Sequence, residues 1–278
     1  MKEKLAKYAA ALAVALVAVG VCHAGILNED IFTRRMPVKF TGYTGTSALT
    51  NFPVLVRLST DIPDFDYEEF YAGGTDLRFA DQDGLELDHE VDTWDTDGTS
   101  LVWVRIPELT DETEIYAYWG SGVSEYGPSQ SDGSVWNSGD YFGVWHLNES
   151  AAALDSSGNA LHGTLHNTSP VAAGRLGAAR QISDGAAKLA DGSGIEIPNY
   201  NSLGVGSTFT VSTWLKYKTG QTPGYDVSSA ANPFTVKLPG GRSHSVTPAQ
   251  RSLITVVQAV RRNNRRSSAM LRTASGSS

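Results

Sequence analysis

The chain has almost no cysteine: Cys22 is the only one among its 278 residues. A single thiol forms neither an internal disulfide nor a thiolate metal site, so the folded chain depends on side-chain packing for its stability. Long apolar runs are missing as well. The most apolar stretch, residues 9–21, has about 13 residues, whereas a membrane-spanning helix needs roughly 18 or more. We therefore expect no transmembrane segment after removal of the N-terminal leader.

The leader itself has the pattern of a secretory signal. Three lysines among the first seven residues precede the apolar run, and small residues lead up to Ala24. This order of basic, apolar and small-residue regions predicts a signal peptide over residues 1–24, with cleavage after Ala24. The mature protein is then secreted, periplasmic or attached to the cell envelope. A lipoprotein signal with lipid on Cys22 is the alternative, although Val21 stands where such signals carry a small residue.

Basic residues are scarce in most of the chain. Residues 25–218 hold 28 acidic and 11 basic side chains, a net charge of 11 − 28 = −17, whereas residues 219–278 hold 8 basic and 1 acidic, a net charge of +7. The acidic body argues against nucleic acid and other polyanions as partners, and it favours a neutral glycan or a surface protein. The basic C-terminal stretch also lacks tryptophan and ends in Ser and Gly, a composition typical of disorder.

Short runs rich in β-branched and aromatic residues predict an all-β fold. They alternate with Gly, Asp, Asn and Pro clusters, which indicates many strands rather than helices. In residues 101–106, a period of two places Val102, Val104 and Ile106 on the core side. The turn at residues 95–98 predicts a hairpin from Glu86 to Ile106, with a positive φ at Gly98. The expected strands cover residues 38–43, 54–58, 77–80, 85–94, 101–106 and 115–119.

The first region resembles the bacterial domain of unknown function called DUF2341. The resemblance rests on Asn-Phe-Pro-Val-Leu-Val at 51–56, Asp-Leu-Arg-Phe at 76–79, His-Glu-Val-Asp-Thr-Trp at 89–94 and Ile-Tyr-Ala-Tyr-Trp-Gly at 115–120. It predicts a domain over residues 25–120, folded as an antiparallel β-sandwich, and a Ser- and Gly-rich linker over 121–140. The family has no established activity to transfer.

The next region resembles the opening half of a laminin G-like, concanavalin A-like jelly roll. The resemblance rests on Tyr-Phe-Gly-Val-Trp-His-Leu-Asn-Glu at 141–149, Asp-Ser-Ser-Gly-Asn-Ala-Leu-His-Gly at 155–163 and Thr-Phe-Thr-Val-Ser-Thr-Trp-Leu-Lys at 208–216. It implies an incomplete domain over residues 141–218, because a full jelly roll needs about twice that length. Residues 219–278 are expected to be a disordered basic tail, for which a genuine tail and a shifted reading frame are both open. DUF2341 domains are often followed by laminin G-like domains on exported proteins.

Glu90, Asp92 and Trp94 are the candidate ligand-binding residues. On a strand they share one face, where carboxylates can accept hydrogen bonds from sugar hydroxyls and an indole can stack on a sugar ring. The alternative is a sheet edge with Trp94 half-buried.

Asp155 is the candidate metal ligand. The resemblance to laminin G-like domains gives an acidic residue in this type of loop a role in calcium binding, while an Asx-turn that caps backbone amides explains the same residues. No catalytic residue and no organic cofactor are indicated, and calcium is left open. Trp145 and Trp214 are interpreted as packing residues of the sandwich, and His146 as part of its opening strand.

These features predict a non-enzymatic binding protein that recognises carbohydrate or another surface ligand outside the cytoplasm. The first alternative is a structural or adhesive envelope component without sugar binding. The second is an accessory module of a glycan-degrading enzyme. Both resemblances point to recognition through folds that support many functions, and neither contributes a reaction.

Overall fold

The computed structural model describes residues 25–40, 42–122, 133–136, 141–172, 174–182, 194–197, 209–214, 235–237, 243–245 and 258–262. The predicted signal peptide and most of the predicted linker and tail lie outside these residues. All strand pairings of the described residues are antiparallel, and the helical elements among them are three short 3-10 turns, so the prediction of an all-β fold is confirmed. Within the same residues, no helix has the length and apolar character of a membrane span.

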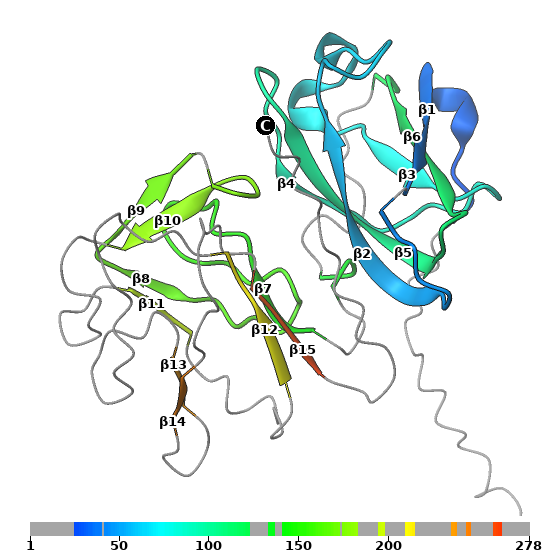
Figure 1. Ribbon diagram of the computed structural model, residues 1–278. Helices are drawn as coiled ribbons and strands as arrows, with labels where there is room; N and C mark the ends of the chain where they lie inside the picture. Colours follow the sequence, from blue (N-terminus) through cyan, green and yellow to red (C-terminus); the bar gives the residue numbers. More distant parts are fainter. Residues whose placement is uncertain are drawn as a thin grey trace, which may run out of the picture.

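Residues 25–122, here called the first unit, form two three-stranded sheets (Figure 1). One sheet has the strand order β2-β5-β4 and the other has the order β1-β6-β3. The strands are β1 (Arg34–Lys39), β2 (Leu49–Leu58), β3 (Arg78–Ala80), β4 (His89–Thr93), β5 (Ser100–Leu109) and β6 (Glu114–Trp119). Three 3-10 turns accompany them: η1 (Glu29–Ile31), η2 (Tyr67–Glu69) and η3 (Ala72–Gly74). Each expected strand overlaps an observed one, but β1 begins and ends about four residues earlier than the apolar pattern indicated.

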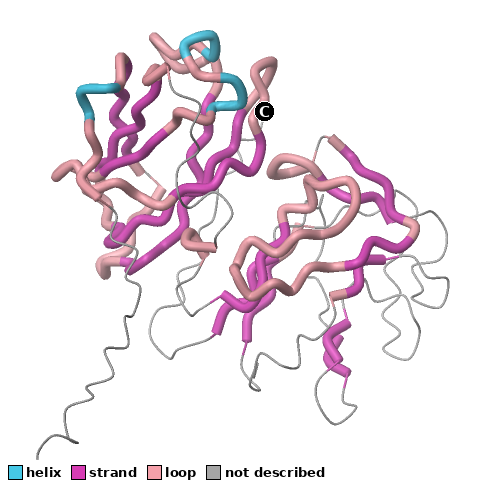
Figure 2. The backbone as a smooth tube through the Cα atoms, turned by 180° about the vertical axis from the view of Figure 1, so that it is seen from behind, coloured by secondary structure: helices cyan, strands magenta, loops and turns pink. Residues whose placement is uncertain are grey.

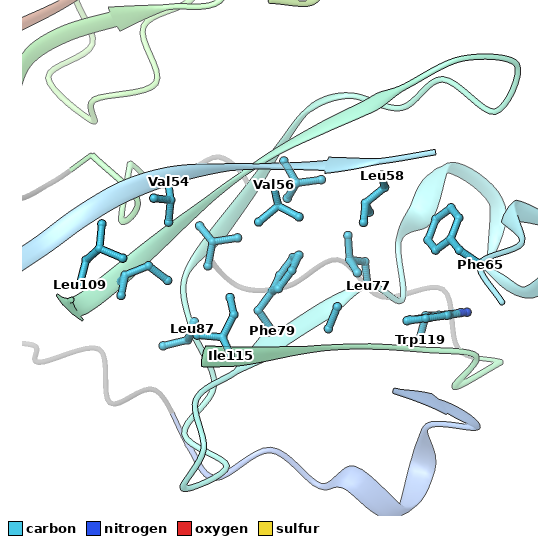
Figure 3. Packing of buried hydrophobic residues seen from close by; sticks show 14 of the residues in the cluster. Val54, Val56, Leu58, Phe65, Leu77, Phe79, Leu87, Leu109, Ile115 and Trp119 are labelled. Carbon is cyan, nitrogen blue, oxygen red and sulfur yellow. The ribbon is translucent and has the colours of Figure 1, made fainter. Parts of the chain in front are cut away.

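The core of the first unit lies between its two sheets. Figure 3 shows Val54, Val56 and Leu58 of β2 pointing toward Leu77, Phe79 and Ile115, which belong to the opposite layer. Val102, Val104 and Ile106 are at most 1% exposed, so the prediction that they face the core is confirmed. The alternation of β2 and β5 therefore builds one apolar layer, and the fold of the first unit is two antiparallel sheets packed face to face.

Strands β4 and β5 form the predicted hairpin, and β4 contains a β-bulge. Their register pairs Glu90 with Trp103, Val91 with Val102 and Thr93 with Leu101, so Asp92 has no partner on β5. The expectation for Gly98 is wrong: this residue does not have a positive φ. The connection is longer than a two-residue turn, and the Asp95 carboxylate caps it by accepting from the Asp97 amide.

Residues 141–262, here called the second unit, are described in part. The strands are β7 (Tyr141–Trp145), β8 (Thr164–His166), β9 (Thr168–Val171), β10 (Ala179–Ile182), β11 (Gly194–Glu196), β12 (Phe209–Ser212), β13 (Thr235–Lys237), β14 (Ser243–Ser245) and β15 (Gln258–Arg262). They pair as β12-β15-β7, β10-β9, β11-β8 and β13-β14. Figure 2 shows strands and loops in this unit, with the 3-10 turns confined to the first unit.

The second unit has a small core of its own. Trp145, Leu147, Ala153 and Leu161 are buried together, with Leu165 and two further aliphatic residues of β11 and its end against them. The described residues of the expected disordered tail all lie in β13, β14 and β15, which differs from that expectation for these residues. The assignment of the second unit to a laminin G-like jelly roll stays a prediction.

Candidate functional site

The bulge in β4 decides where the predicted ligand-binding residues point. His89 and Val91 face the core of the first unit, so Glu90 lies on the outer face, opposite Trp103. Because the bulge inserts one residue, Asp92 and Thr93 both lie on this outer face as well. The structure therefore brings Glu90 and Asp92 together, on the side of the sheet that faces the second unit.

Trp94 lies apart from the two carboxylates. The same bulge returns its side chain to the core side, where its ring packs edge-on against Tyr67 and Phe70 with centroid distances of 5.3 and 5.1 Å. Gly74 has a φ of +69°, and a Cβ at this position would lie 2.5 Å from the Trp94 ring. Trp94 is thus a packing residue. Its ring leaves no room for a side chain at position 74, where the positive φ also favours glycine.

His146 is the centre of the site that Glu90 and Asp92 form. It directly follows β7, and its side chain is 3% exposed. Its Nδ1 lies 3.2 Å from Asp92 Oδ2, and its Nε2 lies 3.5 Å from Glu90 Oε1. The imidazole of the second unit is therefore held between two carboxylates of the first unit.

Each carboxylate is oriented by side-chain donors from other parts of the chain. Glu90 accepts from Trp136 Nε1 at 2.6 Å and from Ser156 Oγ at 2.6 Å. Asp92 accepts from Trp103 Nε1 at 3.2 Å and from Asn148 Nδ2 at 3.3 Å, and its main-chain oxygen accepts from the same amide at 2.6 Å. All of these donors belong to the chain itself, so both carboxylates have their hydrogen-bond partners inside the protein.

Apolar contacts surround the polar group. Val135, Trp136 and Val144 are buried together, with Trp103 and Tyr141 against them. The cluster thus joins β5, the turn at residues 133–136 and β7. We call Glu90, Asp92, Trp103, Trp136 and His146 the joint.

A close backbone approach adds to the joint. Gly177 has a φ of +65°, and an added Cβ would lie 2.7 Å from Thr93 Oγ1 and 3.4 Å from a methyl carbon of Leu101. Leu101, on the outer face of β5, is 4% exposed as a result of this cover. The second unit therefore seals the outer face of the β4–β5 hairpin, which in a sheet with one wet face would be exposed to water.

The electrostatics of the joint favour a protonated histidine. Burial lowers the pKa of the His146 imidazole, but the carboxylates of Asp92 and Glu90 act in the opposite direction more strongly and bring this pKa to about 10. The ordinary value is about 6.5, so His146 is an imidazolium at neutral pH. Burial also raises the pKa of the nearby Glu149 carboxyl.

Asp155, the predicted calcium ligand, is buried in a loop that it caps. Its Oδ1 accepts from the Val144 and Ser157 amides, both at 2.9 Å. Its Oδ2 accepts from Ser157 Oγ at 2.9 Å and from the Leu161 amide at 3.0 Å. This arrangement has the geometry of an extended Asx cap. Across the described residues, no three His, Cys, Asp or Glu side chains are grouped so that they could hold a metal ion.

The two tryptophans expected to be packing residues of the second unit differ in exposure. Trp145 is 5% exposed, and its Nε1 donates to the Leu161 carbonyl at 2.9 Å. Trp214 is 38% exposed, with the Arg175 guanidinium 5.6 Å from its ring centroid. The packing interpretation holds for Trp145, whereas Trp214 presents part of its indole to solvent.

Sequence reasoning missed three members of the joint: Trp103, Trp136 and His146. Alternation with Val102 and Val104 places Trp103 on the outer face of β5, and an aromatic there is a signal that something covers that face. Trp136 lies in the predicted linker, where a tryptophan among Ser and Gly is the same kind of signal. Nothing local to His146 indicates that its partners lie on β4.

Comparison with known protein families confirms a DUF2341 domain, described as a domain of unknown function, over residues 73–139. This range includes Glu90, Asp92, Trp103 and Trp136, and it ends before His146. Searches of curated proteins and of solved structures found no match.

Proposed function

We propose that the protein is a non-catalytic structural or adhesive component of an exported surface, in which the DUF2341 unit and the following β unit act as one docked body. The joint carries this proposal. In the joint, the carboxylates of Glu90 and Asp92 are engaged in contacts between the units. The side chain of Glu90 is 13% exposed and that of Asp92 is 1% exposed. Groups so enclosed serve to fix a geometry, because a general acid or base has to reach the proton that it transfers to or from substrate.

The location of this function is outside the cytoplasm, as the leader at residues 1–24 predicts. A rigid pair of β units serves there as a spacer that presents loops to other surface molecules. The partners are then proteins or glycans of the surface.

Carbohydrate recognition is the second candidate, and the exposed indole of Trp214 favours it. An indole face can stack on the apolar face of a sugar ring, and Trp214 offers 38% of its surface to solvent. Trp94 does not have this geometry, because it is partly buried against Tyr67, Phe70 and Gly74. A sugar site on this protein would therefore involve Trp214 rather than the hairpin face of β4.

The two candidates separate in one binding experiment with the full chain. The labelled protein is applied to a glycan array and to the envelope fraction of its source cells, with and without competing soluble sugars. The structural or adhesive function predicts saturable binding to the envelope fraction that sugars do not displace, and no glycan retained at millimolar concentration. Glycan retention that is lost in Trp214→Ala but kept in the control Tyr71→Ala, which changes another exposed aromatic, would replace this function with carbohydrate recognition.

A further inference from the structure

The joint has the composition of a site that binds an organic cation. Two carboxylates and two indole rings surround one planar charged ring. The Trp103 ring lies 6.2 Å from the His146 ring and nearly parallel to it, at 24°, and the Trp136 ring lies 5.8 Å away. Indole faces attract cations at about this distance, and more strongly where water is excluded. The two ring nitrogens of His146 lie 3.2 and 3.5 Å from the carboxylates of Asp92 and Glu90, so both carboxylates contact the imidazolium directly.

The walls of this site are connected to one another without His146. The Trp136 indole N–H donates to Glu90, and the Trp103 indole N–H donates to Asp92. The two indole rings also contact each other, with centroids 5.0 Å apart. Each carboxylate is thus fixed by one aromatic wall, and the aromatic walls are fixed by each other. Such a site is preorganised, because binding of its occupant does not have to order the surrounding side chains.

The walls and the occupant come from different parts of the chain. Glu90, Asp92, Trp103 and Trp136 all lie within residues 73–139, the range that matches the DUF2341 family, and His146 lies beyond this range. The pocket therefore belongs to the domain, while the cation that fills it belongs to the next β unit.

We propose that Glu90, Asp92, Trp103 and Trp136 form a cation-binding cage of the DUF2341 domain, and that the imidazolium of His146 is its built-in ligand. The charged groups around the cage are Glu90 and Asp92 on β4, and Glu149 in the loop after β7, whose carbonyl accepts from Arg180. The polar neighbours Ser156, Asn148 and Thr93 are neutral donors to the carboxylates. The cage selects a flat cation, and it holds the two units together whatever ligand the protein recognises.

Removal of the built-in ligand tests the cage by chemical rescue. In full-length His146→Gly, imidazole at about pH 6 is mainly a cation and has the shape of the deleted ring. We expect it to bind saturably and to recover most of the lost thermal midpoint, as a ligand of the folded state does. Pyrazole has the same ring size and is neutral, so it recovers little. Wild-type protein, whose cage is full, shows no shift with either compound.

Further outcomes make the proposal decisive. Glu90→Gln with Asp92→Asn, added to His146→Gly, abolishes the rescue if the cage binds charge. Equal rescue by imidazole and pyrazole, or no rescue by either, overturns the proposal. If His146→Gly does not fold, NMR of histidine-labelled wild-type protein replaces it. A His146 ring that is doubly protonated at about pH 8, where exposed histidines are neutral, supports the cage, and a neutral ring there overturns it.

Discussion

Replacement of His146 by glutamine removes the one positive charge of the joint and keeps a polar side chain of similar length. Glu90 and Asp92 then remain enclosed without a cation between them. The loss of one partner of a buried ion pair typically costs about 3–5 kcal/mol. A pKa of about 10 in place of 6.5 corresponds to a similar figure, roughly 5 kcal/mol of preference for the imidazolium. We expect His146→Gln to lower the free energy of unfolding by about 3–5 kcal/mol.

The chain offers a matched control for this change. His166 Nε2 lies 3.2 Å from Glu196 Oε2, but the two side chains are 41% and 66% exposed. An exposed pair of this kind contributes about 0–1 kcal/mol. His166→Gln therefore deletes the same atoms from the same type of pair, and the difference between the two variants isolates the effect of burial. Both are measured by urea unfolding, followed by tryptophan fluorescence because Trp103 and Trp136 report on the joint.

The pH dependence of the free energy of unfolding tests the same prediction in a second way. The pKa of His146 is raised in the folded state, so its stabilising contribution is complete below about pH 6.5 and is lost as the pH rises toward 10. Wild-type protein should therefore lose stability across this range more steeply than His146→Gln does. A cost below about 1 kcal/mol for His146→Gln, together with parallel pH profiles for the two proteins, would refute the reasoning.

Three further predictions concern other parts of the fold. Burial, with a smaller effect of Arg78, lowers the pKa of His89 to about 4, so stability should fall as the pH drops from about 6.5 to 4. Thermal melts of His89→Leu should lack this dependence of stability on pH. An unchanged dependence would exclude His89 as its source. Asp155→Ala leaves four donors without their acceptor and should cost at least about 2 kcal/mol, equally in calcium and in chelator, whereas a cost seen only with calcium would mean an ion ligand. Leu58→Ala, at a position 1% exposed, should cost about 2–5 kcal/mol in denaturant unfolding, and Ile26→Ala, at a position 74% exposed, about 0.5 or less; equal costs would contradict the core assignment.

The sequence predicted the strands of the first unit because their side chains alternate. Val102, Val104 and Ile106 follow a strict period of two, and that period fixes which face is buried. The same rule of alternation failed for β4, the strand next to β5. It grouped Trp94 with Glu90 and Asp92, because alternation assumes a regular strand and the bulge after Val91 breaks it. A bulge depends on the pairing partner, so nothing within residues 89–94 indicates it.

The joint could be predicted only in part. Glu90 and Asp92 were candidate ligand-binding residues because carboxylates and an indole on one face of a strand can hold a sugar. The actual partner is His146, whose contact with β4 is set by how the two units pack. Long-range contacts of this kind leave no local pattern in one sequence. The alternative given for Asp155, an Asx-turn, has the observed geometry because such a cap is local and its residue pattern is short.

The turn at residues 133–136 has a consequence for where this protein can be divided. By strand pattern the first unit is finished at residue 120, yet the indole that orients Glu90 comes from Trp136. A fragment that stops at residue 120 would uncover Leu101 and Trp103 and leave two carboxylates without the imidazolium between them. The smallest piece that evolution can exchange between proteins without exposing this surface therefore extends past the last strand of the sandwich. The β unit that follows it has to supply a cation to Glu90 and Asp92.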